Sequence, residues 1–318
     1  MGVEATAQPT GLVRARVAGF ARRRFALWLL LPALVLTLGF YVLPTVGSYW
    51  LAFFDWDGLG PVGGFVGLDN FSRLLHDDSF LAAALHNVWI FVVLLVATNT
   101  VSLGLAMLID RKFALRNVYR AIIFLPYVLS PLAIGFIWQV LLSPSIGILN
   151  PALDAVGLGG LQREWLADPG TALWVVIAAL AWQWNALATV VFLAGLQSVP
   201  GELRDAARID GARPARVLRD VTLPFLAPAF TTVNVLLAVF AFRAFDLVYV
   251  LTGPLGAPDG ETLVMGTAVY TTAFPTGQFS SGASFSYAVA QGIFLTAVLG
   301  LAAFALLAFL GRREKRVL

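Results

Sequence analysis

Six apolar stretches, each about as long as a membrane-spanning helix, restrict the folds that this sequence can adopt. They cover about residues 25–49, 86–108, 121–142, 171–197, 224–251 and 284–310. A helix needs roughly 20 predominantly apolar residues to cross the hydrocarbon core of a bilayer. The sequence therefore predicts an all-α integral membrane protein with six transmembrane helices.

The composition agrees with a chain that lies mainly in a lipid bilayer. Hydrophobic residues make up 59% and charged residues 12%, and the mean hydropathy is +0.83, whereas a soluble domain carries about 25% charged residues. The first stretch is longer than a secretory signal and no small-residue cleavage site follows it, so we expect it to remain as an anchor. The absence of cysteine excludes disulfides and thiolate metal sites.

The basic residues predict the orientation of the six stretches. Four segments hold most of the 21 Lys and Arg residues, namely Arg14, Arg16, Arg22, Arg23 and Arg24; Arg111, Lys112, Arg116 and Arg120; Arg204, Arg208, Arg213, Arg216 and Arg219; Arg312, Arg313, Lys315 and Arg316. The opposite connections hold only Arg73 and Arg163. Because cytoplasmic loops carry the excess of Lys and Arg, both termini should be cytoplasmic. The net charge of +3 then reflects this rule, and no nucleic-acid partner is expected.

The predicted organisation is a single helical bundle with two basic ends. Residues 1–24 form a cytoplasmic tail, residues 25–311 form the six-helix domain, and residues 312–318 form a basic cytoplasmic end. Within the domain, residues 199–223 form a long cytoplasmic loop between the fourth and fifth stretches.

This loop reads ELRDAARIDGARPARVLRDVTLP from Glu202 to Pro224. A segment this polar cannot cross hydrocarbon, so it must lie at a membrane surface. Pro200 can open a helix, and the helix dipole favours the acidic residues that lie in its first turns. Gly211 either ends this helix or lets another backbone come close. A helix lying on lipid would be strongly basic with large apolar residues. The mixed charge and small residues of this loop favour docking of a protein partner instead.

The loop resembles the EAA loop of the permeases of binding-protein-dependent ABC importers. That motif is Glu-Ala-Ala, three residues, Gly, nine residues, Ile, one residue and Leu-Pro. At these spacings the chain has Asp205-Ala206-Ala207, Gly211, Val221 and Leu223-Pro224, with Asp for Glu and Val for Ile. Further similar stretches include VGLDNFSRLL at 66–75, RNVYRAIIFLPYVLSPLAIGFIW at 116–138 and WLADPGTAL at 165–173. The similarity covers about residues 25–315 and is greatest to sugar and glycerol-phosphate permeases, the group that includes the larger maltose permease subunit.

The resemblance implies a type I ABC importer permease, a multi-pass protein of the bacterial cytoplasmic (inner) membrane. It also implies four partners besides the lipid bilayer: a second homologous permease subunit, two cytoplasmic ATP-binding subunits and an extracytoplasmic solute-binding protein. Each ATP-binding subunit would take one EAA loop. The residues implied in this coupling are Glu202, Asp205, Ala206, Ala207, Asp210, Gly211, Leu223 and Pro224.

The chain lacks the motifs of an ATPase or of another enzyme. A P-loop needs Gly-Lys followed by Ser or Thr, but the two lysines, Lys112 and Lys315, are followed by Phe113 and Arg316. There is no nucleophile elbow and no cluster of metal ligands, so we expect neither catalytic residues nor a cofactor or metal. ATP would be hydrolysed by a separate subunit.

Three other functions are alternatives to an ATP-driven sugar importer. Asn150-Pro151-Ala152 suggests a six-helix polyol or water channel, but such channels need two copies of this motif and the chain has one. A structural anchor for cytoplasmic enzymes would not explain polar residues within the stretches. An importer for a non-carbohydrate solute stays open.

Polar and aromatic residues inside the fourth and fifth stretches are candidates for contact with a transported solute. The set consists of Trp182, Gln183, Asn185, Asn234, Phe240, Arg243 and Asp246. Sugars bind through hydrogen bonds to hydroxyls and through aromatic rings, so amides beside tryptophans favour neutral sugars. The alternative is that the tryptophans belong to an interfacial belt. Arg243 and Asp246 should lie near the outer surface, where their spacing permits an ion pair.

Overall fold

The computed structural model describes residues 28–111, 113–275 and 284–317. The predicted basic tail of residues 1–24 lies outside these residues. The described chain is helical, and within it the one β-type contact is an isolated bridge between Phe54 and Phe65. The prediction of an all-α protein is confirmed.

The first apolar helix covers Trp28–Leu51 and includes a π-helical turn, η1 (Leu38–Val42), before α2 (Leu43–Leu51). The remaining elements are α3 (Asp69–Leu74), α4 (Asp78–Asp110), α5 (Arg116–Val128), α6 (Pro131–Leu142), α7 (Leu149–Ala155), η2 (Gly159–Leu161), α8 (Pro169–Ser198), α9 (Gly201–Ile209), α10 (Pro214–Val217), η3 (Leu218–Thr222), α11 (Leu223–Phe225), α12 (Ala227–Phe242), α13 (Asp246–Thr252), α14 (Met265–Ala273) and α15 (Phe285–Val317).

Four described helices are long and apolar enough to cross a membrane: Trp28–Leu51, α4, α8 and the Phe285–Phe309 part of α15. Two further helix pairs pass the same test together but are bent, so the number rises to six if each bent pair is one span. The pairs are α5 with α6, and α10–α11 with α12.

The third apolar stretch, predicted as one span at 121–142, is divided into two helices. α5 and α6 meet at an angle of 101°. Leu129 and Ser130 between them are extended, with ψ of 144° and 147°, the conformation that a proline favours in the residue before it. The Ser130 hydroxyl accepts a hydrogen bond from Ala133 N at 3.2 Å and caps α6. The prediction of one continuous helix is wrong here, and Pro131 supplies the reason.

The fifth stretch also differs from its predicted bounds of 224–251. Pro224 does not open the long helix but lies in α11, before a bend of 65° that leads into α12. Pro228 occupies the first turn of α12 instead, where its missing N–H costs no hydrogen bond. The helix ends at Phe242, and α13 is separate from it.

Tertiary packing ends α12, because no proline or glycine lies between Phe242 and α13. Phe245 at the turn has φ −138° and ψ −66°. This turn passes close to Gly266, where an added Cβ would lie 3.2 Å from the Phe245 Cβ and 3.3 Å from the Ala244 carbonyl oxygen. A side chain at position 266, 21 residues beyond Phe245, would crowd this turn, and the glycine leaves room for it.

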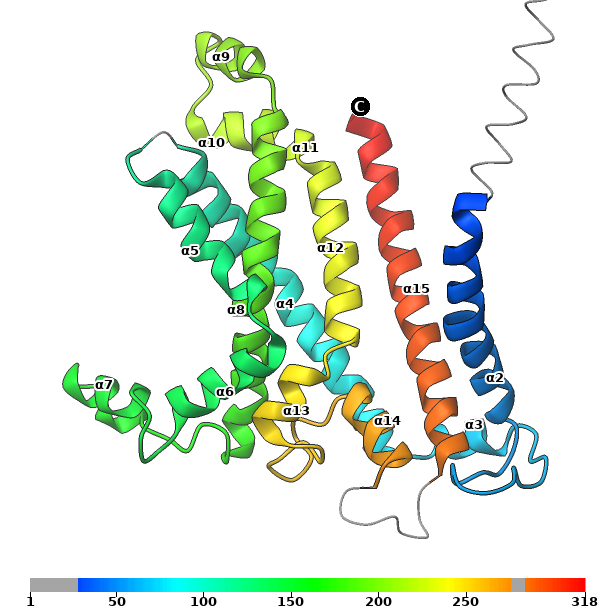
Figure 1. Ribbon diagram of the computed structural model, residues 1–318. Helices are drawn as coiled ribbons and strands as arrows, with labels where there is room; N and C mark the ends of the chain where they lie inside the picture. The colour runs from blue at the N-terminus through cyan, green and yellow to red at the C-terminus, as the bar shows by residue number, and fades with distance from the viewer. Residues whose placement is uncertain (1–27, 112, 276–283, 318) are drawn as a thin grey trace, which may run out of the picture.

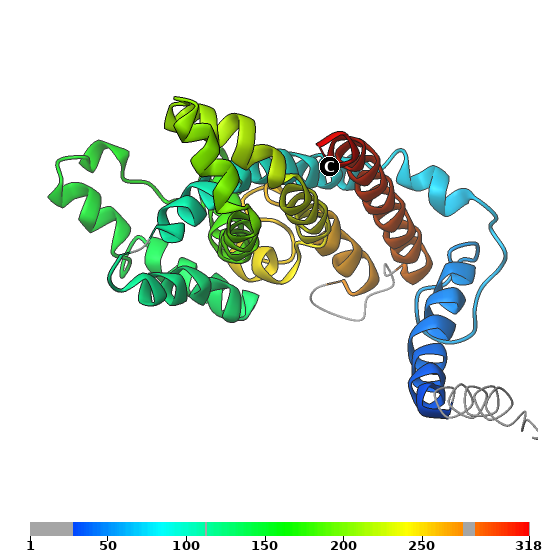
Figure 2. The same cartoon turned by 90° about the horizontal axis from the view of Figure 1, so that it is seen from above.

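The core of the bundle lies between α4, α8 and α12, which run side by side (Figure 1). Its fully buried residues include Leu94, Leu180, Phe192 and Leu237. A second cluster joins α3, α4, α14 and α15 and centres on Phe80 and Tyr287. The first helix lies at the edge of the bundle (Figure 2), and its most apolar window has no buried residue.

Buried polar groups fix one end of the bundle. Asn87 of α4 donates to the Ala241 carbonyl oxygen at 2.9 Å and accepts from Met265 N at 2.8 Å. It therefore holds the end of α12 and the start of α14 against α4. Asp77 caps α4 by accepting from Phe80 N at 3.0 Å, and its other oxygen accepts from the Tyr287 hydroxyl at 2.5 Å.

The two ends of the bundle differ in the short elements that they carry (Figure 1). α9 and the C-terminal end of α15 lie at one end, which we name the α9 end. α3, α7, α13 and α14 lie at the opposite end, which we name the α13 end.

Candidate functional site

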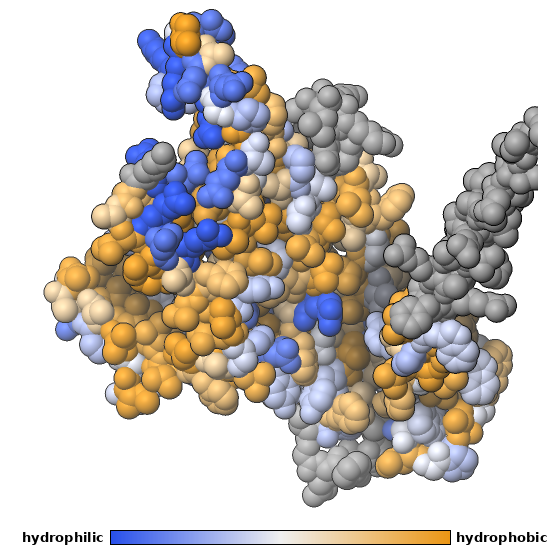
Figure 3. Space-filling model, turned by 45° about the horizontal axis from the view of Figure 1, so that its top comes forward, coloured by the Kyte–Doolittle hydropathy of each residue, from blue (hydrophilic) through white to orange (hydrophobic). Residues whose placement is uncertain are grey.

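Two regions carry the residues that the sequence singles out: the helix α9 that projects from one end, and a cleft beside α12. α9 has no buried residue and stands out from the bundle (Figure 1). Its surroundings are mostly hydrophilic, in contrast to the apolar body below it (Figure 3).

The end of α9 is a Schellman motif. Gly211 N donates to the Arg208 carbonyl oxygen at 3.0 Å, and Ala212 N donates to the Ala207 carbonyl oxygen at 3.0 Å. Gly211 has φ +80°, a conformation that suits glycine, and no atom lies within 4 Å of where its Cβ would be. The sequence leaves two roles open for Gly211, and the structure shows the first, the end of this helix. The residue also leaves the surface beside it open.

The residues predicted for coupling divide between this helix and the bundle. Glu202, Asp205, Ala206, Asp210 and Gly211 are exposed, Ala207 is half-buried, and Leu223 and Pro224 are half-buried in α11 at the base of α12. Ile209 is 87% exposed at the last turn of α9. A large apolar side chain so exposed on a projecting helix is suited to burial against a partner.

The predicted solute-contact residues are only partly brought together. A cleft of about 370 Å³ lies between α8, α12, the start of α13 and the α5–α6 break. Its lining includes four of the predicted residues: Gln183, Phe240, Arg243 and Asp246. Trp184, Tyr127 and Pro131 also line it.

Aromatic rings and unpaired polar atoms give the cleft its chemical character. Trp184 and Phe240 stack with centroids 4.9 Å apart and an angle of 29° between their planes. Gln183 and Trp184 are 6% and 4% exposed, and Gln183 Oε1 and Trp184 Nε1 have no hydrogen-bond partner among the described residues. A buried polar atom left without a partner costs about 1–3 kcal/mol. Both atoms are buried, so a solute with hydroxyl groups would supply an acceptor for the indole and a donor for the amide only after a side-chain movement opens these atoms to the cleft.

Arg243 and Asp246 are exposed at the cleft, but within the described residues no ion pair joins them. The expected pair assumed one continuous helix. Because α12 ends at Phe242 and turns at Phe245, the two residues do not share a helical face. Both charges are left available at the cleft.

Asn185, Asn234 and Trp182 lie outside the cleft lining. Asn185 Oδ1 accepts from the Ser102 hydroxyl at 3.0 Å, and Asn234 Oδ1 accepts from Asn99 Nδ2 at 2.8 Å. Both partners belong to α4, so these amides hold α8 and α12 to α4. Trp182 is exposed and lies edge-on to Trp138, with centroids 6.4 Å apart.

Helix geometry explains this division. Successive residues of a helix are rotated by about 100°, so residues 182–185 cannot all face one cleft. The face that lines it is Leu180, Gln183, Trp184 and Leu187, a spacing of three and four residues that the sequence already contains. Tyr127 and Pro131 could not be found this way, because they depend on the break between α5 and α6.

Asn150, the residue that suggested a channel, has a local structural role. Its Oδ1 accepts from Trp165 Nε1 at 2.8 Å, and its Nδ2 donates to the Arg163 carbonyl oxygen at 3.0 Å. These bonds fasten α7 to the segment before α8 at the α13 end (Figure 1). The Asn-Pro-Ala sequence therefore stabilises a connection and does not line the bundle interior.

Single cysteines should separate the cleft residues from the packing residues. Because the sequence has no cysteine, an introduced thiol is the only one. We expect a water-soluble maleimide to label cysteines at positions 243 and 246 much faster than cysteines at positions 185 and 234, which face α4. Equal labelling of all four after denaturation is the control. Labelling of position 234 as fast as position 243 in the folded protein would contradict the cleft geometry.

Comparison with known proteins gives one family. The family model described as binding-protein-dependent transport system inner membrane component matches residues 98–316. The diacetylchitobiose uptake system permease protein of Streptomyces coelicolor is 34% identical over 314 residues, covering 95% of this chain and 86% of that protein. The sn-glycerol-3-phosphate transport system permease protein of Agrobacterium fabrum is 33% identical, covering 87% and 91%.

The fold is also found in a solved structure. A chain of the bacterial alginate ABC transporter, in complex with a periplasmic protein that holds an alginate pentasaccharide, superposes with a TM-score of 0.79. The identity is 23%, and the match covers 94% of this chain and 99% of that chain.

Proposed function

The chain belongs to the family of binding-protein-dependent transport system inner membrane components, and from this membership we propose that it forms half of the translocation pathway of an ATP-driven sugar importer. The observation that carries the sugar assignment is the cleft. It joins a stacked Trp184–Phe240 pair to the unpartnered polar atoms of Gln183 and Trp184. Aromatic faces and amide groups are what polyhydroxylated rings require.

We propose six spans with both termini and α9 in the cytoplasm. Counting each bent helix pair as one span gives six, and α9 lies at the same end as the C-terminal end of α15 (Figure 1). The loop of residues 199–223, which contains α9, carries Arg204, Arg208, Arg213, Arg216 and Arg219. The positive-inside rule requires such basic residues of a cytoplasmic loop.

The orientation predicts a simple accessibility result. A membrane-impermeant thiol reagent added to intact cells should leave a cysteine at position 205 unlabelled, and should label it once the membrane is permeabilised. A cysteine at position 145, in the α6–α7 connection at the α13 end, is the matched control and should be labelled in intact cells. Labelling at position 205 without permeabilisation would refute this topology.

We propose that α9 docks on a separate ATP-binding subunit. Two such subunits, a second homologous permease and an extracytoplasmic solute-binding protein would complete the importer. The support on this chain is the projection of α9, the exposure of Ile209, and the open surface at Gly211. ATP binding can move the permease only through contacts that differ between its states, and α9 is the described element placed for them.

Substitution of Gly211 should test docking. Gly211→Arg places a long cation on the open surface, and we expect solute-stimulated ATP hydrolysis and transport to fall at least about tenfold, which corresponds to about 1.4 kcal/mol. Gly211→Asn is the control, because asparagine tolerates the left-handed conformation and is small. It should keep most of the activity. Full activity of an assembled Gly211→Arg complex would exclude close approach of a partner at this residue.

Neutral sugars rank before phosphorylated polyols as the solute. Arg243 is exposed in the cleft and could hold a phosphate, which favours the second class. Asp246 lines the same cleft and would repel an anion. The balance of the two charges, together with the aromatic stack, favours an uncharged solute.

Uptake by the complete reconstituted importer tests the sugar assignment. With its solute-binding protein present, it should take up a labelled saccharide such as diacetylchitobiose or maltose in an ATP-dependent manner. Gln183→Leu should slow this uptake about tenfold, because one hydrogen bond worth about 1 kcal/mol or more is lost. Gln162→Leu, the same change in the exposed connection before α8, should have little effect. Transport of amino acids or peptides without any response to saccharides or polyols would overturn the assignment.

A further inference from the structure

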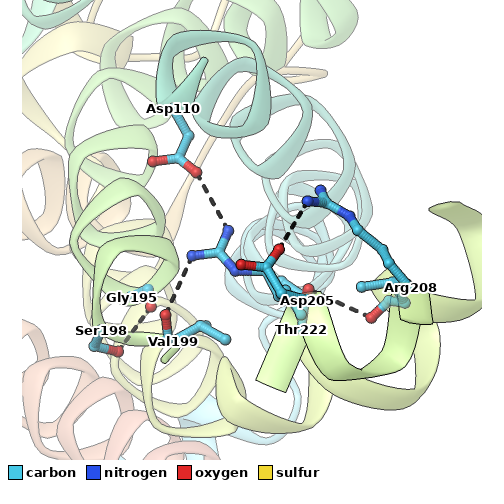
Figure 4. A network of polar contacts seen from close by, with 9 residues as sticks. Asp110, Gly195, Ser198, Val199, Asp205, Arg208 and Thr222 are labelled. Atoms are coloured by element: carbon cyan, nitrogen blue, oxygen red, sulfur yellow. Dashed lines mark hydrogen bonds and ion pairs between the residues drawn. The ribbon is translucent and has the colours of Figure 1, made fainter. Parts of the chain in front are cut away.

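The guanidinium of Arg204 in α9 makes two polar contacts, with Asp110 and with Val199, both of which are labelled in Figure 4. Its Nη1 lies 3.7 Å from Asp110 Oδ2, and its Nη2 donates to the Val199 carbonyl oxygen at 3.2 Å. Asp110 is the last residue of α4, and Val199 caps the end of α8. One side chain of the projecting helix is thus bound to the ends of both helices.

Within the described residues, no other side chain of α9 makes a hydrogen bond or ion pair with a membrane helix. Arg208 binds Asp205 of the same helix at 3.1 Å (Figure 4). Further along the segment, Arg216 and Arg219 pair with Asp220, again within a few residues. These local pairs stabilise the segment but do not tie it to the bundle.

Apolar packing does not take the place of these absent polar contacts between α9 and the membrane helices. α9 has no buried residue, and a cleft of about 690 Å³ lies between α9 and the ends of α4 and α8. Burial begins beyond α9, at Val217 of α10 and Thr222 of η3. Asp110 and Arg204 both line this cleft. Their ion pair therefore bridges a space that side chains leave open, and each partner's side chain is 27% exposed.

We propose that Arg204 is a positioning residue that holds α9 at a fixed angle to α4 and α8, so that both helices follow when an ATP-binding subunit displaces α9. The inference rests on the proposed docking of α9. Without Arg204, the described contacts leave α9 held by its two chain connections and by its packing against α10 and η3, and no polar contact fixes its angle to α4 and α8. With Arg204, the motion reaches α8, which carries Gln183 and Trp184 at the solute cleft.

A role in coupling can be separated from a role in folding. A partly exposed ion pair contributes little to folding stability, so its removal should leave the thermal midpoint of the purified permease nearly unchanged. The expected effect therefore lies in the number of ATP molecules hydrolysed per solute transported.

The test uses the complete complex with its solute-binding protein in proteoliposomes. Arg204→Ala and Asp110→Ala each remove the ion pair from one side, and each should raise the number of ATP molecules hydrolysed per solute severalfold. Arg163→Ala is the control, because it removes a comparable ion pair, 3.4 Å to Asp168, at the α13 end. It should leave the ratio unchanged.

Exchange of the two charges gives the decisive comparison. Arg204→Asp alone should uncouple the complex. Addition of Asp110→Arg should restore part of the coupling, because the ion pair with α4 is re-formed with its direction reversed, while an aspartate cannot donate to the Val199 carbonyl oxygen. An unchanged ratio in assembled Arg204→Ala and Asp110→Ala complexes would overturn the inference, as would a double variant as uncoupled as Arg204→Asp. If the solute is not a sugar, the ratio is measured with the solute that is transported. In that case the sugar assignment fails, but the measured ratio still tests the role of Arg204.

Discussion

The packing of α4 along α8 is the contact on which the rest of the structure depends. Lipid is as apolar as leucine, so helices in a bilayer associate through close packing and interhelical hydrogen bonds. α4 supplies both kinds of contact: buried residues such as Ile90 and Leu94, and the polar groups of Ser102 and Asn99. α12 is held to the same helix by Asn234 and by the Asn87 bond to its last turn. The cleft beside α12, the α9 connection and the outer elements are arranged around this unit.

The cleft beside α12 lies where two helices are interrupted. Helices α5 and α6 part at Pro131, and α12 and α13 part at Phe245; both residues line the cleft. Irregular backbone at membrane depth is tolerated where it is buried in protein or lines a cavity. An interrupted helix also leaves side chains such as Arg243 facing open space and not a neighbouring turn. The two interruptions at Pro131 and Phe245 therefore supply polar surface to the cleft, which two continuous helices would not do.

The sequence predicts most of the helices but only part of the site. The end of α9 follows from Gly211, and the break before α6 could have been expected from Ser130-Pro131. The end of α12 could not, because no proline or glycine marks it and the turn packs against Gly266, 21 residues beyond Phe245. The amides Asn185 and Asn234 have the polarity of solute contacts, but hydropathy does not show which face of a helix meets α4. That assignment requires the packing itself.

The continuity of α8 decides which route a displacement of α9 can take to the cleft. α8 is a single helix from Pro169 to Ser198, and Gln183 lies 16 residues before Val199, or about 24 Å at 1.5 Å per residue. A rigid helix carries a movement over this length with little loss. The other route, through α11 into α12, passes a bend of 65° at Leu226, where a change of angle can absorb the movement. Arg204 binds α9 to the end of the unbroken helix and to α4 beside it, so the straight route is the one that the polar contacts reinforce.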